Sequence, residues 1–319
     1  MEHALTPHLR TLPFVLLDGA LATELEPMGC DLADPLWSAK VLLEAPEKIR
    51  TVHAAYLAAG ADVVTTASYQ ATYEGFAGRG LGADAATGLM QRSVQLAREA
   101  RDAYWSGLAE ADRASRLRPL VAASVGPYGA MLADGSEYRG HYGLDVKTLM
   151  DFHRPRLAAL LAAGPDLLAC ETLPSLLEAQ ALVQLLENEF PDAQAWISFS
   201  CTDDRHISEG TALDACVAEL SPCPQVLAIG FNCTAPRHAQ SLLAAAAAVP
   251  DHKPLLLYPN SGEGYDAATK CWHGSRDAAG FAASAKGWLE AGARLIGGCC
   301  RTGPAEIAAL AAWRTTLAT

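Results

Sequence analysis

Short runs of apolar and β-branched residues recur along the chain, and longer segments of mixed apolar and polar residues separate them. Apolar runs of this length, bounded by turn residues, predict buried β-strands. The predicted strands span residues 14–19, 61–69, 119–127, 165–172, 195–201, 226–233, 254–260 and 294–300.

The intervening segments have apolar positions at helical spacing, most clearly over residues 42–60, 88–105 and 173–190. Several of them end at a glycine directly before the next strand, in the sequences "LAAGAD", "LAAGPD" and "LEAGAR". A glycine there is typical of a helix C-cap. The pattern therefore predicts strand and helix in alternation, eight times.

Continuously apolar strands are typical of a parallel sheet that is covered on both faces. Eight strand–helix units within 319 residues fit a closed (β/α)8 TIM-type barrel of the α/β class. A doubly wound open sheet is the alternative. Because no linker or low-complexity tract divides the chain, we expect one domain over residues 1–319.

Composition and charge narrow the class of partner. The chain is 50% hydrophobic and has a formal net charge of -12, so it offers no basic face for nucleic acid. Its first residues lack a signal-peptide pattern, and no apolar run is long enough to span a membrane. We therefore expect a cytoplasmic protein whose nine cysteines are mostly reduced thiols. No feature indicates its oligomeric state.

Reactive side chains gather where the predicted strands end. Active sites of such barrels lie at the C-terminal ends of the strands. Asp18 ends the first strand, Tyr69 the second, Glu171 the fourth and Asn232 the sixth. We expect these residues to surround one site.

Three cysteines also lie at strand ends. The sequences "IGFNC" and "IGGCC" share one frame, which places Cys233 and Cys300 at equivalent heights in the barrel. Adjacent side chains of a regular strand point to opposite faces, so Cys299 reaches the same ion only if the backbone leaves β geometry. Gly297 and Gly298 would permit a turn or bulge there, because glycine tolerates unusual φ values.

Three thiolates at one site suit Zn²⁺, and three protein ligands leave a fourth position open for a substrate. The adjacent cysteines are also consistent with small buried residues, a strained vicinal disulfide or a redox switch. Cys201, at the end of the fifth strand, is a rival ligand. Inert thiols are expected at Cys30, Cys170, Cys216 and Cys223.

Seven motifs carry a family resemblance: "LDGALATEL" (17–25), "TTASYQAT" (65–72), "SVGPYGAMLADGSEYRG" (124–140), "ACETLP" (169–174), "GFNC" (230–233), "YPNSGE" (258–263) and "IGGCCRT" (296–302). By these motifs the chain resembles the homocysteine S-methyltransferases, a family of zinc-dependent barrels, from Phe14 to Leu310. It is most similar to the bacterial enzymes that use S-methylmethionine. The resemblance implies that Cys233, Cys299 and Cys300 hold zinc and that homocysteine takes the fourth position.

The resemblance also implies how an amino acid is bound. Asp18 and Glu171 would engage the ammonium group of homocysteine, and backbone amides around Gly19 and Ala20 would receive its carboxylate. The alternatives are a local turn cap for Asp18 and a helix N-terminal charge for Glu171. The further candidates are Tyr69, for which packing at the barrel mouth is the alternative, and Asn232, as a supporting donor.

The expected reaction transfers a methyl group from S-methylmethionine, or less well from S-adenosylmethionine, to the thiolate of L-homocysteine and forms methionine. Selenocysteine or another thiol is an alternative acceptor. A barrel without catalysis, whose adjacent thiols sense redox state or buffer metal, is the alternative from another class. An amino-acid clamp at Asp18 and Glu171 argues against it.

Overall fold

All eight predicted strands are present in the computed structural model, which describes residues 3–32, 38–266, 271–273 and 277–317. The strands are β1 (Val15–Leu16), β2 (Val63–Thr65), β3 (Leu120–Val125), β4 (Leu167–Leu173), β5 (Ala195–Phe199), β6 (Val226–Asn232), β7 (Leu255–Tyr258) and β10 (Ala293–Ile296). Most are shorter than predicted at the C-terminal end, because the residues there have left the sheet to build loops.

These strands form one parallel sheet in the order β1-β10-β7-β6-β5-β4-β3-β2. A parallel bridge between Leu17 and Val63 joins β1 to β2, the two strands at the ends of this order. The amide of Asp18 also donates to the Val63 carbonyl at 3.1 Å. The sheet therefore closes, which confirms the predicted (β/α)8 barrel and excludes the open sheet.

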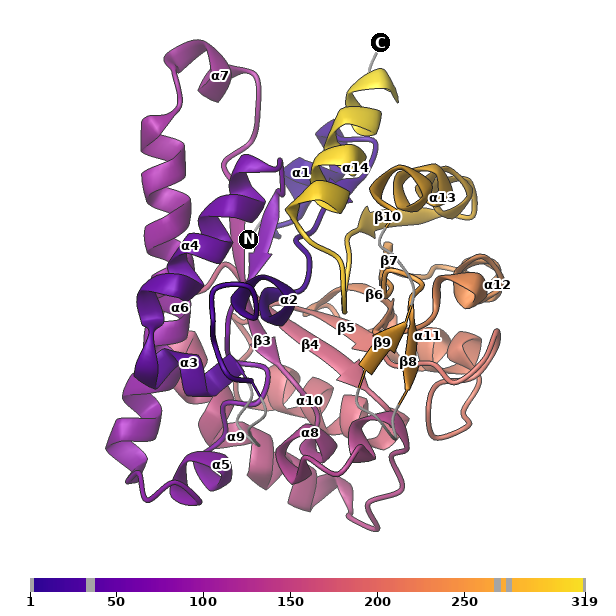
Figure 1. Cartoon of the computed structure of the whole chain (residues 1–319). Helices are drawn as coiled ribbons and strands as arrows, with labels where there is room; N and C mark the ends of the chain where they lie inside the picture. The colour runs from indigo at the N-terminus through magenta and orange to yellow at the C-terminus, as the bar shows by residue number, and fades with distance from the viewer. Residues whose placement is uncertain (1–2, 33–37, 267–270, 274–276, 318–319) are drawn as a thin grey trace.

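The long helices surround the strands on the outside of the barrel, and short helices lie in the loops at its ends (Figure 1). They are α1 (Thr6–Thr11), α2 (Leu21–Leu25), α3 (Ser38–Glu44), α4 (Pro46–Ala58), α5 (Tyr73–Ala77), α6 (Ala83–Gly107), α7 (Glu110–Ala114), α8 (Tyr128–Leu132), η1 (Ser136–Tyr138), α9 (Val146–Ala162), α10 (Leu176–Asn188), α11 (Leu213–Leu220), η2 (Pro236–His238), α12 (Ala239–Ala247), α13 (Ala278–Glu290) and α14 (Pro304–Leu317). An antiparallel pair, β8 (Gly264–Asp266) and β9 (Cys271–His273), follows β7. None of the described helices has the length and apolarity needed to cross a membrane.

One predicted helix, over residues 42–60, is two helices in the structure. α3 ends at Glu44 and α4 begins at Pro46, with Ala45 between them at φ -155°. A residue before proline is disfavoured in the α conformation, whereas proline itself is well suited to the first helical turn. The helical spacing of apolar residues continues across Ala45, so the spacing by itself predicted one unbroken helix.

The glycines before three strands have the predicted role. Gly60, Gly164 and Gly292 have φ values of 105°, 68° and 102°. This left-handed conformation ends α4, α9 and α13 and turns the chain back toward the sheet.

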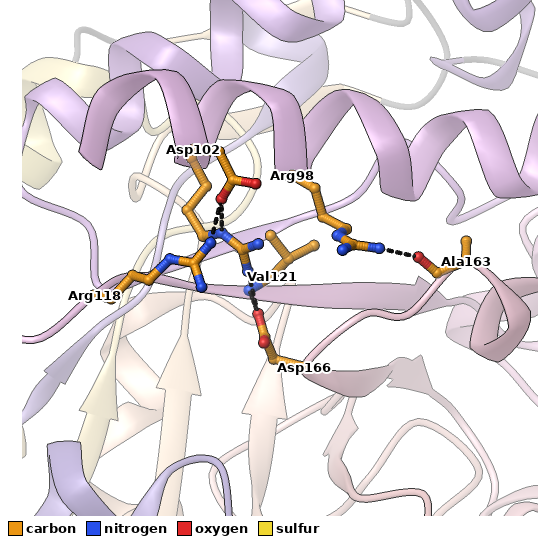
Figure 2. Close-up of polar contacts among 7 residues, drawn as sticks. Arg98, Asp102, Arg118, Val121, Ala163 and Asp166 are labelled. Atoms are coloured by element: carbon orange, nitrogen blue, oxygen red, sulfur yellow. Dashed lines mark hydrogen bonds and ion pairs between the residues drawn. The ribbon is translucent and has the colours of Figure 1, made fainter. Parts of the chain in front are cut away.

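Two of these turns lead to an aspartate that fastens the bottom of the barrel. Asp166 accepts a hydrogen bond from the Val121 amide at 2.7 Å and pairs with Arg101 of α6 at 2.7 Å. Arg118 extends the network by pairing with Asp102 of the same helix at 2.5 Å (Figure 2). The carboxylate thereby ties the longest helix to the beginnings of β3 and β4.

Asp62, directly before β2, repeats this arrangement two strands away in the sheet. It accepts the Leu16 amide at 2.8 Å and pairs with Arg314 of α14. We expect Asp62→Ala to destabilise the protein by about 3 kcal/mol, because it leaves the partly buried Arg314 guanidinium without its carboxylate and the Leu16 amide without its acceptor. Thermal unfolding should show a melting temperature lower by about 6 °C.

The matched control for this prediction is Asp151→Ala. Asp151 pairs with Lys147 at 2.6 Å and with Arg154 at 2.5 Å on the surface of α9, where ion pairs contribute little. Equal losses of melting temperature in the two variants would contradict the assignment of a structural role to Asp62.

Inward-facing positions of the strands change from apolar to polar toward the C-terminal end. The lower layers contain Ala122, Ala169, Trp196 and Leu256, all fully buried. Two residues further along the same strands, the inward positions are Ser124, Glu171, Ser198 and Tyr258. The side-chain period of two in a strand places this second set together above a packed apolar core.

Candidate metal centre

The structure brings the three predicted cysteines together. The Sγ atoms of Cys233, Cys299 and Cys300 all lie within 4.8 Å of one another, and those of Cys233 and Cys300 are 3.7 Å apart. Among the described residues, these cysteines are the only cluster of three or more His, Cys, Asp or Glu side chains that could hold a metal ion. Cys201 does not belong to this cluster. The rival ligand is therefore set aside.

A tight turn after β10 lets both adjacent cysteines face one point. β10 ends at Ile296, so neither cysteine lies in regular strand geometry. The Cys299 amide donates to the Pro259 carbonyl at 2.8 Å, and the Cys299 carbonyl accepts the Thr302 amide at 3.0 Å. The predicted departure from β geometry is present.

Gly297 and Gly298 serve this turn for a different reason from the one expected. Neither has a positive φ; the left-handed residues are Cys233, at 48°, and Arg301, at 66°. A Cβ atom on Gly297 would lie 2.6 Å from the Leu17 Cβ, and one on Gly298 would lie 2.2 Å from the Thr302 Oγ1. The glycines are required for close approach and not for backbone freedom.

The donor set fits a divalent cation that prefers sulfur. All three cysteines are free thiols in the structure, without a vicinal disulfide. The pKa of the Cys299 thiol lies well above its ordinary value, chiefly because Cys233 shares a hydrogen bond with it and also because the group is buried. The pKa values of Cys233 and Cys300 are raised in the same direction. Three such thiols ionise together only if a cation balances their charge.

Glu171 lies near the C-terminal end of β4, and its side chain faces the barrel interior above the apolar core. Its carboxylate accepts hydrogen bonds from the Ser124 hydroxyl and, at 2.9 Å, from the Tyr258 hydroxyl. Burial raises its pKa. Because α10 begins only at Leu176, capped by the Ser175 side chain, Glu171 is not a helix N-terminal charge.

Asp18 faces the same interior from the end of β1. Its carboxylate accepts the Thr65 amide at 2.7 Å and the Thr65 hydroxyl at 3.0 Å, so it bonds across to β2 and does not cap its own turn. Burial raises its pKa to about 8, and the charge of Glu171 adds to the shift. Two buried carboxylates that disfavour each other's ionisation would both be stabilised by a bound cation.

The backbone after Asp18 is tightly packed. The Ala20 amide donates to the Thr302 carbonyl at 2.9 Å, whereas no bond is recorded for the Gly19 amide among the described residues. A Cβ on Gly19 would lie 2.8 Å from that carbonyl, which explains the glycine. Of the two predicted amides, that of Gly19 is the one available to a ligand.

Asn232 connects the carboxylate side of the site to the cysteines. Its Oδ1 accepts the Thr172 amide at 2.8 Å and the Ser198 hydroxyl at 2.7 Å, and its Nδ2 donates to the Thr172 hydroxyl at 2.8 Å. The same Nδ2 faces the Cys299 Sγ at 3.9 Å. Thr172 has φ 60°, a costly conformation for a β-branched residue, and Asn232 holds it there.

Tyr69 enters the site from the loop after β2. Burial raises the pKa of its hydroxyl, and the nearby Cys233 thiol is the next cause. Its ring packs so closely on Gly126 that a Cβ there would lie 2.7 Å from ring atoms. The hydroxyl therefore lies in the field of the Cys233 thiol, and the ring packs at the barrel mouth.

Sequence reasoning missed the residue that holds this loop, Arg156 of α9. Its side chain is 1% exposed and donates to the carbonyls of Gly126, Ser68 and Tyr69 at 2.8, 2.6 and 2.5 Å. Arg156 occupies the apolar face of α9, four residues before Leu160. A charged residue on a buried helix face was the signal that could have identified it.

Comparisons with known proteins agree with this geometry. A family profile described as Homocysteine S-methyltransferase matches residues 15–313. The chain is 54% identical over 311 residues to Homocysteine S-methyltransferase YbgG of Bacillus subtilis (strain 168), covering 98% of both chains. It is 56% identical over 299 residues to Homocysteine S-methyltransferase of Escherichia coli (strain K12), covering 93% of this chain and 94% of that one. The crystal structure of the metallated homocysteine methyltransferase MmuM from Escherichia coli is similar, with a TM-score of 0.87 and 51% identity over 98% of this chain and 100% of that chain.

Proposed function

This chain belongs to the homocysteine S-methyltransferase family, and from that membership we propose that it is a zinc enzyme that methylates L-homocysteine with S-methylmethionine. The observation that carries the proposal is the arrangement of the site. Three cysteine Sγ atoms within 4.8 Å of one another lie beside the buried carboxylates of Glu171 and Asp18. A metal-binding group and a clamp for an ammonium together suit a thiol amino acid.

Zinc is the metal proposed for this centre. Thiolate ligands select soft or borderline cations, and a three-cysteine set leaves a fourth position for substrate. A free thiol with a pKa of about 8.5 is only a few per cent ionised at neutral pH. Zinc bound by Cys233, Cys299 and Cys300 would supply a positive charge that keeps the homocysteine sulfur ionised.

The surrounding residues would bind and orient the amino acid. Glu171 and Asp18 receive its ammonium group, and the Gly19 amide donates to its carboxylate. The hydroxyls of Ser124 and Tyr258 fix the Glu171 carboxylate, so little side-chain freedom is lost on binding. Holding the sulfur in line with the donor's methyl carbon can lower the barrier by about 7–11 kcal/mol.

The reaction balances without a further reactant. A new sulfur–carbon bond forms between the homocysteine thiolate and a methyl group of the sulfonium, while the bond from that methyl to the donor sulfur breaks. Its electron pair stays on the donor sulfur, which becomes a neutral thioether. With S-methylmethionine as donor, both products are methionine.

We place the enzyme in the cytoplasm, where its thiols remain reduced.

We expect methionine formation from S-methylmethionine, weaker use of S-adenosylmethionine and negligible use of betaine. The reasons are the resemblance of the loops after β2 and β3 to the S-methylmethionine-using enzymes and the bulk of a nucleoside at the same mouth. Parallel assays with the three donors at equal concentration, using protein loaded with zinc, measure the order directly.

Betaine turnover equal to that with S-methylmethionine would place the chain in another branch of the family. The acceptor is tested in the same assay by replacing homocysteine with selenocysteine. Faster methylation of selenocysteine would make it the preferred acceptor, and no methylation of either would refute the proposed function.

A further inference from the structure

The loop between β3 and α9 carries the short helix η1 over the barrel mouth. The Ser200 hydroxyl, just beyond β5, donates to the Glu137 carbonyl at 3.1 Å. η1 also packs on α8, because a Cβ on Gly129 would lie 2.5 Å from the Glu137 amide nitrogen. Gly140, two residues beyond η1, lies against Glu209, because a Cβ on Gly140 would lie 3.1 Å from the Glu209 Cβ. η1 is therefore held by α8 of its own loop and by the segment that follows β5.

Tyr138 places an aromatic ring beside the metal centre. The Cys233 thiol lies near its hydroxyl and, ahead of burial, is the main reason why the pKa of that hydroxyl lies well above the ordinary value. The residue as a whole is 47% exposed. A large aromatic side chain thus borders the cysteines on one side and solvent on the other, which is where a second substrate would enter.

Glu137 adds a negative charge to the same place. Its Oε2 atom is buried and has no hydrogen-bond partner among the described residues. The carboxylate lies close enough to the Tyr69 hydroxyl to raise that group's pKa. The neighbouring cation, Arg139, pairs with Asp134 at 3.7 Å. A buried acceptor without a partner is costly unless a ligand completes it.

We infer that Glu137 and Tyr138 form the binding site of the methyl donor, a small cationic sulfonium. The inference rests on the proposed function, which requires two substrates at one metal centre. Asp18 and Glu171 face the barrel interior and serve the acceptor, whereas Glu137 and Tyr138 lie on η1 above the cysteines and remain for the donor.

The chemistry of a sulfonium matches these two side chains. A soft cation without N–H donors is stabilised by the face of an aromatic ring and by a nearby carboxylate. Burial raises the pKa of the Glu137 carboxyl, and a cationic ligand beside it favours the ionised form. The ring of Tyr138 would also shield the reacting methyl group from water.

The test is the variant Glu137→Gln, which keeps the shape of the side chain and removes its charge. We expect the KM for S-methylmethionine to rise about tenfold, because a buried charge no longer faces the sulfonium. The KM for homocysteine and the metal content should stay at wild-type values, which also shows that the variant folds. A rise in donor KM of less than about threefold would overturn the inference.

Variants of Tyr138 test the ring separately. Tyr138→Leu should raise the donor KM more than Tyr138→Phe, because phenylalanine keeps the aromatic face. The matched control is Glu110→Gln, an equal change of net charge on the exposed helix α7, far from the mouth in sequence and structure. Equal effects of Glu110→Gln and Glu137→Gln would reduce the result to long-range electrostatics and overturn the inference. Failure of the wild-type enzyme to methylate homocysteine would instead refute the proposed function.

Discussion

Cys300→Ser is expected to lose the metal and, with it, methyl transfer. A serine hydroxyl is not ionised at neutral pH and is a poor ligand where sulfur is preferred, so two thiolates remain to hold the ion. We expect kcat/KM to fall at least about 10³-fold, equivalent to about 4 kcal/mol of transition-state stabilisation. Elemental analysis of protein purified without chelator should give about one zinc per wild-type chain and almost none in the variant.

Cys233→Ser and Cys299→Ser should behave in the same way, because all three Sγ atoms belong to one group. The matched control is Cys201→Ser, since Cys201 follows β5 near the mouth yet lies outside that group. Circular dichroism should show an intact barrel after metal loss, because the core is packed without the ion. Full zinc occupancy in Cys300→Ser would contradict the assignment.

Much of the fold and of the metal centre followed from local sequence pattern. Apolar runs of strand length predicted each strand of the barrel, and glycine caps preceded three of them. These signals could be read because they depend on neighbouring residues. The shared frame of "IGFNC" and "IGGCC" predicted that Cys233 and Cys300 would meet, since a closed barrel places equivalent strand ends at one level. Regular geometry was sufficient for these inferences.

The details of the site depend on contacts between distant segments. Thr65, which binds Asp18, and Thr172, which Asn232 holds at φ 60°, have no local signal in the sequence. The position of η1 over the mouth is set by Ser200, which lies 63 residues further along the chain than Glu137. Loop conformations of this kind are determined by packing against other loops, which spacing and periodicity do not describe.

Glu171→Gln is expected to weaken homocysteine binding while leaving the metal in place. Glutamine keeps an oxygen for the hydroxyls of Ser124 and Tyr258 but carries no charge to pair with the substrate's ammonium. Loss of a buried charge-assisted hydrogen bond costs about 1.5–3 kcal/mol, so the KM for homocysteine should rise about 10- to 100-fold. Steady-state kinetics at saturating donor, with metal analysis of the same preparation, measure both quantities.

The matched control is Glu187→Gln, the same substitution on the exposed face of α10, the helix that follows β4. A homocysteine KM and a kcat/KM that both stay at wild-type values in Glu171→Gln would remove Glu171 from the site. Loss of zinc in that variant would instead make Glu171 part of the metal centre, although the three sulfur atoms already account for the protein ligands of an open zinc site. Because the predicted change is confined to the acceptor's KM, it also separates Glu171 from Glu137, whose replacement should change only the KM of the donor.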